Sequence, residues 1–365
     1  MTDAPHKLLV ACILASLFGV AQAASAPAWQ RLHLPVPEQQ TGYDFPVYAN
    51  HKLNGDLRSI REVIIVQHGI QRNGDDYYAA AMELLQASGR SPDEVLVLAP
   101  NFPGKPDTGF DGMPVWSVQG WTGGEAALPG TGTQAGLSSL QVLDDIAQLL
   151  ADKARLPLLK KITFAGHSGG GQLMHRYAVL NHVDEALRAR GLELQYVIAN
   201  PSSYLYFTPE RPDRSGAGGF VLYDKTVCPA YDDYRYGMQN MVPYARGMAG
   251  MDLYQRHWQR QVTYLVGSLD TDPNHRVLDK SCGAEAEGPT RYERAHAYWK
   301  YEQYLGKPAP VSKAAPASAS HHYFDVQGVG HDQGKMFGSQ CGVKLLFGDR
   351  AATGKQASQC LAVQP

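Results

Sequence analysis

The stretch of sequence that decides the fold runs from residue 162 to residue 177 and reads Ile162-Thr163-Phe164-Ala165-Gly166-His167-Ser168-Gly169-Gly170-Gly171-Gln172-Leu173-Met174-His175-Arg176-Tyr177. An apolar, β-type run leads into Gly-x-Ser-x-Gly, and a helical pattern follows. A serine at such a sharp turn has strained backbone geometry, so Gly166 and Gly170, two residues to either side, must lack side chains. The strain would hold the Ser168 hydroxyl out over the sheet edge, beside the free N–H groups at the start of a helix. Ser168 is therefore a candidate nucleophile; the alternative is a glycine-rich turn in which Ser168 only caps the helix.

Further short apolar runs extend this pattern along the chain, at residues 63–66, 95–98, 196–199, 262–266 and 323–326. Runs that are apolar on both faces and separated by helical lengths are typical of a buried, mostly parallel sheet. Residues 77–87 and 138–152 carry apolar side chains at intervals of three and four, as crossover helices do. The sequence has no repeat of fixed period, which excludes solenoids and propellers. The expected fold class is α/β, with a mostly parallel central sheet flanked by helices.

The composition is that of an ordinary globular protein, because 44% of the 365 residues are hydrophobic and 19% are charged. This excludes a disordered, collagenous or coiled-coil protein. The 33 Lys and Arg residues nearly balance the 35 Asp and Glu residues, for a formal net charge of −2. We therefore expect no basic surface that would bind nucleic acid or an anionic membrane.

The segment 1–23 has the pattern of an export signal. Lys7 ends a short polar start, residues 8–20 are apolar, and Ala21-Gln22-Ala23 provides a small-x-small cleavage pattern. The apolar run is too short to anchor the chain stably across a bilayer. We expect a secreted or periplasmic protein whose residues 24–365 form a single domain. Leu9-Val10-Ala11-Cys12 is similar to a bacterial lipoprotein box, but it precedes most of the apolar run, which such a box should end.

Four cysteines follow this segment, at Cys228, Cys282, Cys341 and Cys360. An even number of cysteines in an exported chain favours disulfides. Four cysteines allow three pairings, and the shorter loops favour Cys341 with Cys360 and Cys228 with Cys282. A zinc site is the alternative, although the sequence contains no Cys-x-x-Cys pair.

Two segments fit the alternation of strands and helices poorly. Residues from about 204 to 257 contain tyrosines among Pro and Gly, which predicts an irregular, cap-like insertion between two strands; the tyrosines are Tyr204, Tyr206, Tyr223, Tyr231, Tyr234, Tyr236, Tyr244 and Tyr254. Such tyrosines either pack in the interior or line a pocket that recognises a substrate. Residues 308–320 are rich in Ala, Pro and Ser, which predicts a flexible surface loop within the same domain.

The serine turn in this strand–helix context resembles the α/β-hydrolase superfamily of serine hydrolases. In that superfamily an acid follows a later strand and a histidine follows the last strand. Residues 262–273 are similar to the acid loop, which implies Asp270 as the acid, with Asp272 as the alternative; a simple polar turn has the same composition. Residues 326–332 resemble the family's Gly-x-Gly-His loop, which implies His331 as the base. The remaining histidines near these motifs are interpreted as bystanders or packed residues: His167, His175, His321 and His322.

The resemblance extends to the strand that ends in His68-Gly69, which is similar to the family's early His-Gly loop. In that loop the residue after the glycine donates its backbone N–H to the oxyanion, which implies Ile70 as one donor and Gly169, directly after the nucleophile, as the second. No Gly-Gly-Gly follows His68, unlike the hormone-sensitive-lipase group. Residues 116–125 and 137–144 instead look like a poorly characterised branch of the superfamily.

The resemblance implies a Ser-His-Asp mechanism. His331 takes the proton of Ser168, Asp270 holds the imidazole, and water later releases an acyl-enzyme. This chemistry requires neither a metal nor another cofactor. The expected function is hydrolysis of a small-molecule or polymeric carboxylic ester. Two alternatives stay open: a secreted serine peptidase of the prolyl type, and a non-catalytic binding protein on the same scaffold.

Overall fold

The structure is a computed structural model, and it describes residues 28–36, 42–216, 218–248, 250–306, 321–354 and 356–364. The predicted export signal at residues 1–23 and the predicted flexible loop at residues 308–320 lie outside the described residues. Within the described ranges, no helix combines the length and the hydrophobicity that crossing a membrane requires.

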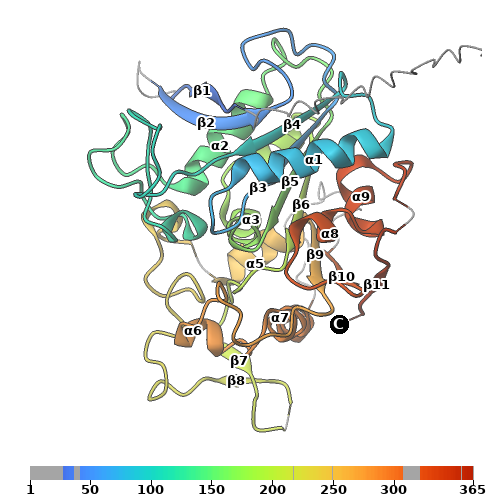
Figure 1. Ribbon diagram of the computed structural model, residues 1–365. Helices are drawn as coiled ribbons and strands as arrows, with labels where there is room; N and C mark the ends of the chain where they lie inside the picture. Colours follow the sequence, from blue (N-terminus) through green and yellow to red (C-terminus); the bar gives the residue numbers. More distant parts are fainter. Residues whose placement is uncertain are drawn as a thin grey trace, which may run out of the picture.

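A sheet forms the centre of the molecule, and in the described part of the chain it has nine strands in the order β1-β2-β4-β3-β5-β6-β9-β10-β11 (Figure 1). These strands are β1 (Gln30–Leu34), β2 (Tyr43–Ala49), β3 (Glu62–Gln67), β4 (Val95–Pro100), β5 (Lys161–His167), β6 (Glu193–Ala199), β9 (Gln261–Gly267), β10 (His321–Val326) and β11 (Cys360–Ala362). The strands from β4 to β10 in this order run parallel. β1, β2 and β11 pair antiparallel at the two edges. The prediction of a mostly parallel central sheet is confirmed.

Helices cover both faces of this sheet (Figure 1). One face packs against α1 (Gly74–Ser88), α8 (Gln333–Phe337) and α9 (Gln340–Phe347). The other face packs against α2 (Ser139–Leu150), α3 (Gly169–Leu180), α5 (Gly250–Trp258) and α7 (Arg291–Leu305). The shorter helices are η1 (Gly120–Gly123), α4 (Asp184–Ala189), η2 (Pro243–Ala245) and α6 (Cys282–Glu285). Because both faces are covered, the parallel strands are apolar in continuous runs, which is why the sequence revealed them.

Alternation along each strand divides the hydrophobic core into two layers. On β3, Val63 and Ile65 face the layer of α2 and α3, whereas Ile64 and Val66 face the layer of α1. Each of these side chains is at most 1% exposed. Full burial of a side chain of this size contributes about 1.5–3 kcal/mol to stability. The core therefore holds the carboxyl ends of the parallel strands in fixed positions, and the candidate site is built there.

The segment between β6 and β9 contains an antiparallel pair, β7 (Glu210–Pro212) and β8 (Phe220–Leu222), together with η2 and α5. It corresponds to the insertion expected at about residues 204–257. Four of its tyrosines are at most 1% exposed and pack in the interior: Tyr204, Tyr206, Tyr231 and Tyr254. For these four tyrosines, the alternative of packing in the interior is therefore the correct one, rather than a pocket that recognises a substrate.

Two disulfides join the four cysteines in the expected pairs, Cys228 with Cys282 at an S–S distance of 2.04 Å and Cys341 with Cys360 at 2.01 Å. The first ties the insertion to α6, and the second ties α9 to the edge strand β11. Each closes a loop of the chain and so reduces the entropy of the unfolded state. The pairing favoured by the shorter loops is confirmed.

Candidate active site

Ser168 lies at the sharp turn between β5 and α3, with φ 59° and ψ −120°. A side-chain carbon on Gly166 would lie 2.2 Å from the carbonyl oxygen of Gly170, and one on Gly170 would lie 2.4 Å from that of Gln67. Both positions require glycine because backbone segments approach each other closely there. The hydroxyl of Ser168 makes no capping hydrogen bond to α3. Its position is therefore not that of a simple helix cap, which was the alternative interpretation of this turn.

His331 and Asp270 lie next to Ser168. The imidazole Nε2 of His331 is 2.8 Å from the Ser168 Oγ, and its Nδ1 is 2.8 Å from Asp270 Oδ2. Asp270 follows β9 and His331 follows β10, and parallel strands end at the same edge of a sheet. Asp272, the alternative acid, is exposed and accepts a hydrogen bond from the backbone N–H of Asn274. The structure thus brings together the three side chains that the resemblance implied, with Asp270 in the position of the acid.

Two residues that the sequence analysis did not identify hold the Asp270 carboxylate. Asn200 donates from Nδ2 to Asp270 Oδ2 at 2.5 Å, and the Arg291 guanidinium is 3.3 Å from Oδ1. Asn200 follows β6 directly, so its position after a predicted parallel strand was a usable signal. Arg291 starts α7, far along the chain from the recognised motifs, and no local pattern marks it.

Burial and neighbouring charges determine the protonation states of Asp270 and His331. Burial alone would raise the pKa of Asp270, but the hydrogen bond and charge of His331 and the charge of Arg291 hold it well below the ordinary value. Burial lowers the pKa of His331, against the raising effect of its hydrogen bond to Asp270. At neutral pH the arrangement is therefore an ionised carboxylate beside a neutral imidazole, which can accept a proton from Ser168.

The backbone amides of Ile70 and Gly169 lie beside Ser168. A side-chain carbon on Gly169 would come within 2.9 Å of the Ile70 nitrogen, so the two peptides are close neighbours. Neither amide donates to another group within the described residues. Two free N–H groups next to a candidate nucleophile are what an oxyanion needs.

Side chains on the β3–α1 loop fix the Ile70 peptide. His68 Nδ1 donates to the Gly69 carbonyl at 2.8 Å, while its Nε2 accepts from the Phe102 N–H at 2.9 Å. Burial lowers the pKa of His68 to about 4, so the ring stays neutral with one donor and one acceptor. Arg72 donates to the Ile70 carbonyl at 3.2 Å and pairs with Asp107 at 2.6 Å. The loop is thereby held with the Ile70 amide at the site.

Two cavities, of about 200 Å³ and 280 Å³, reach Ser168 and Ile70. Polar groups line both of them, and Arg276 and Val277 border the two together. Their lining residues come from segments outside residues 204–257, so in the described part of the chain these cavities are not bordered by the insertion. A larger cavity of about 570 Å³ lies away from Ser168, beside Lys161 and Lys344.

Among the histidines interpreted as bystanders, His167 lies closest to the site: its ring centroid is 4.6 Å from that of His331, and it lines the cavity of about 200 Å³. His167 is buried and its Nδ1 is 3.0 Å from the Tyr77 hydroxyl. His175 Nε2 accepts from the Leu205 N–H at 2.9 Å in the interior. The His321 ring lies in a buried group with Glu302 and His257, at the opposite end of β10 from His331.

Solved structures resemble this chain, although no protein-family model and no curated protein matches its sequence. Among solved structures, poly(aspartic acid) hydrolase-1 from Sphingomonas sp. KT-1 is 19% identical, with a TM-score of 0.56 over 88% of this chain and 99% of that one. LpqC, a poly(3-hydroxybutyrate) depolymerase from Bordetella parapertussis, is 19% identical, with a TM-score of 0.57 over 88% of this chain and 90% of that one.

These two structures and this chain share the α/β-hydrolase fold. The fold expected from the serine turn is therefore confirmed, and the likeness spans most of the chain.

Proposed function

We propose that this chain is an exported serine hydrolase that cleaves a carboxylic ester, with Ser168 as nucleophile, His331 as general base and Asp270 as the orienting acid. The observation that carries the proposal is the continuous pair of 2.8 Å contacts from Ser168 through His331 to Asp270. The shared fold also supports the proposal, since the two similar solved structures are those of a hydrolase and a depolymerase. The two disulfides and the N-terminal export pattern support the location outside the cytoplasm.

The proposed chemistry follows from what each group can do. His331 Nε2 accepts the Ser168 proton as Oγ attacks the ester carbonyl, and the Ile70 and Gly169 amides donate to the resulting oxyanion. Asp270 keeps the Nδ1 proton of His331 in place and stabilises the imidazolium. His331 then gives its proton to the departing alcohol. In the second half His331 activates a water, which releases the acid and regenerates Ser168.

The cavities support a substrate with groups on both sides of the ester bond. Both reach Ser168 and Ile70; the first continues toward Asn73 and Gln333, and the second toward Val118 and Gln119. One cavity could hold the acyl group of an ester and the other its alcohol group. A polymer chain also extends on both sides of the bond that is cleaved, and both similar structures are named for polymer substrates.

The ester assignment is tested by comparing substrates that share a chromophore. We expect the purified protein to hydrolyse short p-nitrophenyl esters with kcat/KM values that exceed those for aminoacyl p-nitroanilides by orders of magnitude. Faster cleavage of the anilides would instead support the prolyl-type peptidase. Failure to cleave either class would favour a non-catalytic binding protein.

The pH dependence of ester hydrolysis provides a second test, because His331 acts only when neutral. Its pKa is lowered from 6.5, chiefly by burial, so the midpoint of the decline in kcat/KM on acidification should lie below pH 6.5. The Arg291 charge contributes to this lowering. In Arg291→Met the pKa of His331 should rise, so the decline should begin at higher pH.

Arg188→Met is the matched control for this profile, since Arg188 forms its ion pair with Asp184 on α4. Its pH profile should overlay that of the parent protein. If Arg291→Met also overlays the parent profile, Arg291 has no part in setting the protonation of the site.

A further inference from the structure

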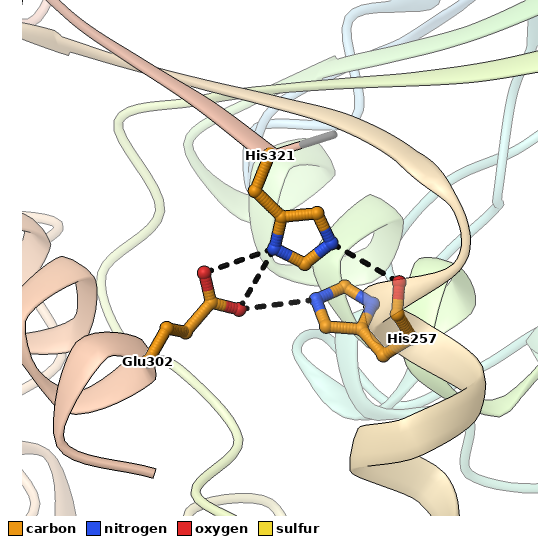
Figure 2. A group of neighbouring side chains, drawn as sticks. All are labelled: His257, Glu302 and His321. Carbon is orange, nitrogen blue, oxygen red and sulfur yellow. Dashed lines mark hydrogen bonds and ion pairs between the residues drawn. The ribbon is translucent and has the colours of Figure 1, made fainter. Parts of the chain in front are cut away.

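Three side chains that have no part in the proposed reaction converge in the interior at the amino end of β10. They are His257 on α5, Glu302 on α7 and His321 on β10 (Figure 2). Their side chains are 0%, 1% and 1% exposed, respectively. One nitrogen or oxygen atom from each lies within 4.8 Å of those of the other two. Figure 2 shows both imidazole rings turned toward the carboxylate.

Backbone carbonyls fix the orientation of both rings. His257 Nδ1 is 3.0 Å from the Ala178 carbonyl oxygen, and His321 Nε2 is 3.1 Å from the carbonyl oxygen of His257. A carbonyl only accepts, so each of these ring nitrogens carries a proton and donates it. In a neutral imidazole the other nitrogen then has a free lone pair. For both rings that nitrogen faces Glu302: His257 Nε2 at 3.5 Å and His321 Nδ1 at 2.9 Å.

Three electron-pair donors therefore face one another in a buried space. Two imidazole lone pairs and a carboxylate face one another favourably only with a positive charge between them, which is either a proton on one ring or a metal ion bound by all three groups. Metal-binding histidines show the same arrangement, with the far nitrogen donating to a carbonyl and the near nitrogen facing the ion. Two imidazoles and one carboxylate are a ligand set that zinc uses in proteins.

We propose that His257, Glu302 and His321 bind a zinc ion, through His257 Nε2, a Glu302 carboxylate oxygen and His321 Nδ1. Zinc bonds of about 2.0–2.2 Å in a tetrahedral arrangement place neighbouring ligand atoms roughly 3.3–3.5 Å apart. Glu302 Oε1 already lies near this spacing from both rings, at 3.1 Å from His321 Nδ1 and 3.5 Å from His257 Nε2. All three ligand atoms lie within 4.8 Å of one another, and binding one ion would bring them to this spacing through rotation of the side chains.

Two tyrosine hydroxyls border the group and complete its surroundings. Tyr264 Oη is 3.0 Å from His257 Nε2, and the Tyr323 hydroxyl donates to Glu302. One of them, or a water, can take the fourth zinc position. Both tyrosines come from the neighbouring strands β9 and β10, so the site is bordered by the sheet itself.

The zinc would have a structural role, because it lies far from Ser168. His321 pairs with Val262 at the start of the parallel β9–β10 pair, whereas Asp270 and His331 follow the far ends of the same strands. At about 3.3 Å per residue, a full strand length separates the two sites. The ion would link α5 and α7 to β10 through His257, Glu302 and His321, and so stabilise the packing of these three elements. This role is independent of the proposed ester hydrolysis.

Zinc uptake by the purified protein tests the proposal directly. The protein is stripped with EDTA, equilibrated with zinc chloride, passed over a desalting column and analysed for metal. Reductant is omitted, because thiols released from the two disulfides would themselves bind zinc. We expect one zinc per chain and a melting temperature that rises by a few degrees with zinc, because the ion binds the folded state. Zinc content at background with an unchanged melting temperature would overturn the proposal.

Variants locate the ion. His321→Ala and Glu302→Gln should each weaken zinc binding more than about 100-fold, since even the loss of an outer partner costs 10–100-fold. His322→Ala is the matched control: it removes the next imidazole on the same strand, and successive side chains point to opposite faces. It should bind zinc as the parent does. Retention of zinc by His321→Ala and Glu302→Gln would overturn the assignment.

The zinc-edge X-ray absorption spectrum keeps the proposal testable even if those variants fail to fold. In the parent protein we expect scattering from two imidazoles and from oxygen, without sulfur. A sulfur-ligated ion, or one without imidazole scattering, would place the zinc elsewhere and reject the site.

Discussion

Replacing Ser168 with alanine is expected to lower kcat/KM for ester hydrolysis by a factor of about 10³ or more while the protein stays folded. Without Oγ no acyl-enzyme forms, and only the amide donors and substrate binding remain. The fold should tolerate the change, because the hydroxyl does not cap α3 and its contact is with His331. Kinetics with a p-nitrophenyl ester, together with a thermal unfolding curve, measure both effects.

Ser138→Ala is the matched control for this change. Ser138 caps α2: its side chain accepts from the Leu140 N–H at 3.2 Å and donates to the Gly124 carbonyl at 2.7 Å, and it lines neither of the two cavities that reach Ser168. Loss of such a cap costs about 1 kcal/mol of stability, so the melting temperature should fall while kcat/KM is unchanged. Ser168→Ala should show the opposite pattern. Full activity of folded Ser168→Ala protein would contradict the assignment of the nucleophile.

Asp270→Asn is expected to reduce kcat by a factor of about 10³–10⁴, since an amide in place of the carboxylate favours the wrong imidazole tautomer. The Asn side chain would face His331 Nδ1 with either an oxygen or an NH₂ group, and it could not stabilise the imidazolium. It would also leave the Arg291 guanidinium without its carboxylate, which is 3.3 Å away in this structure. Kinetics and the melting temperature are again measured together.

Asp272→Asn is the control that separates the two candidate acids. Asp272 is exposed, and its side chain accepts the Asn274 amide in a turn. The asparagine side chain can make the same turn contact, so activity and stability should stay near those of the parent. If Asp272→Asn were the more damaging change, the acid would be Asp272 and the geometry described here would not be the working one.

The sequence was most informative where one residue type has a single physical role. Gly166 and Gly170 mark the turn because backbone atoms approach within 2.2–2.4 Å of where their side chains would begin. The parallel strands are apolar on both faces, so their runs stood out against the rest of the chain. The order of nucleophile, acid and histidine along the chain then indicated which strand ends meet at one edge.

The edge strands were not predicted, because polar residues interrupt β2 and because β11 is too short to give a signal. β2 contains Asp44 and Pro46, and β11 has only three residues. A proline within a run argues against a central strand. Their places depend on antiparallel pairing with strands already in the sheet, which is a tertiary effect.

The partners of the site residues were missed for the same reason. Arg291 reaches Asp270 across the interior from α7, and the group of His257, Glu302 and His321 joins three elements that no motif links. His321 was interpreted as a bystander in an exposed loop, whereas it begins β10 and its side chain is buried. Only the packing of α5 and α7 against β10 reveals its partners.

Labelling with a fluorophosphonate tests the central claim most directly, because such a probe reacts covalently with an activated serine. The purified protein is labelled, digested with trypsin and mapped by mass spectrometry. The account predicts a single adduct on the peptide of residues 162–176, in which Ser168 is the only serine, and much slower labelling of His331→Ala. An adduct on a different peptide, or no adduct on folded protein, would contradict it.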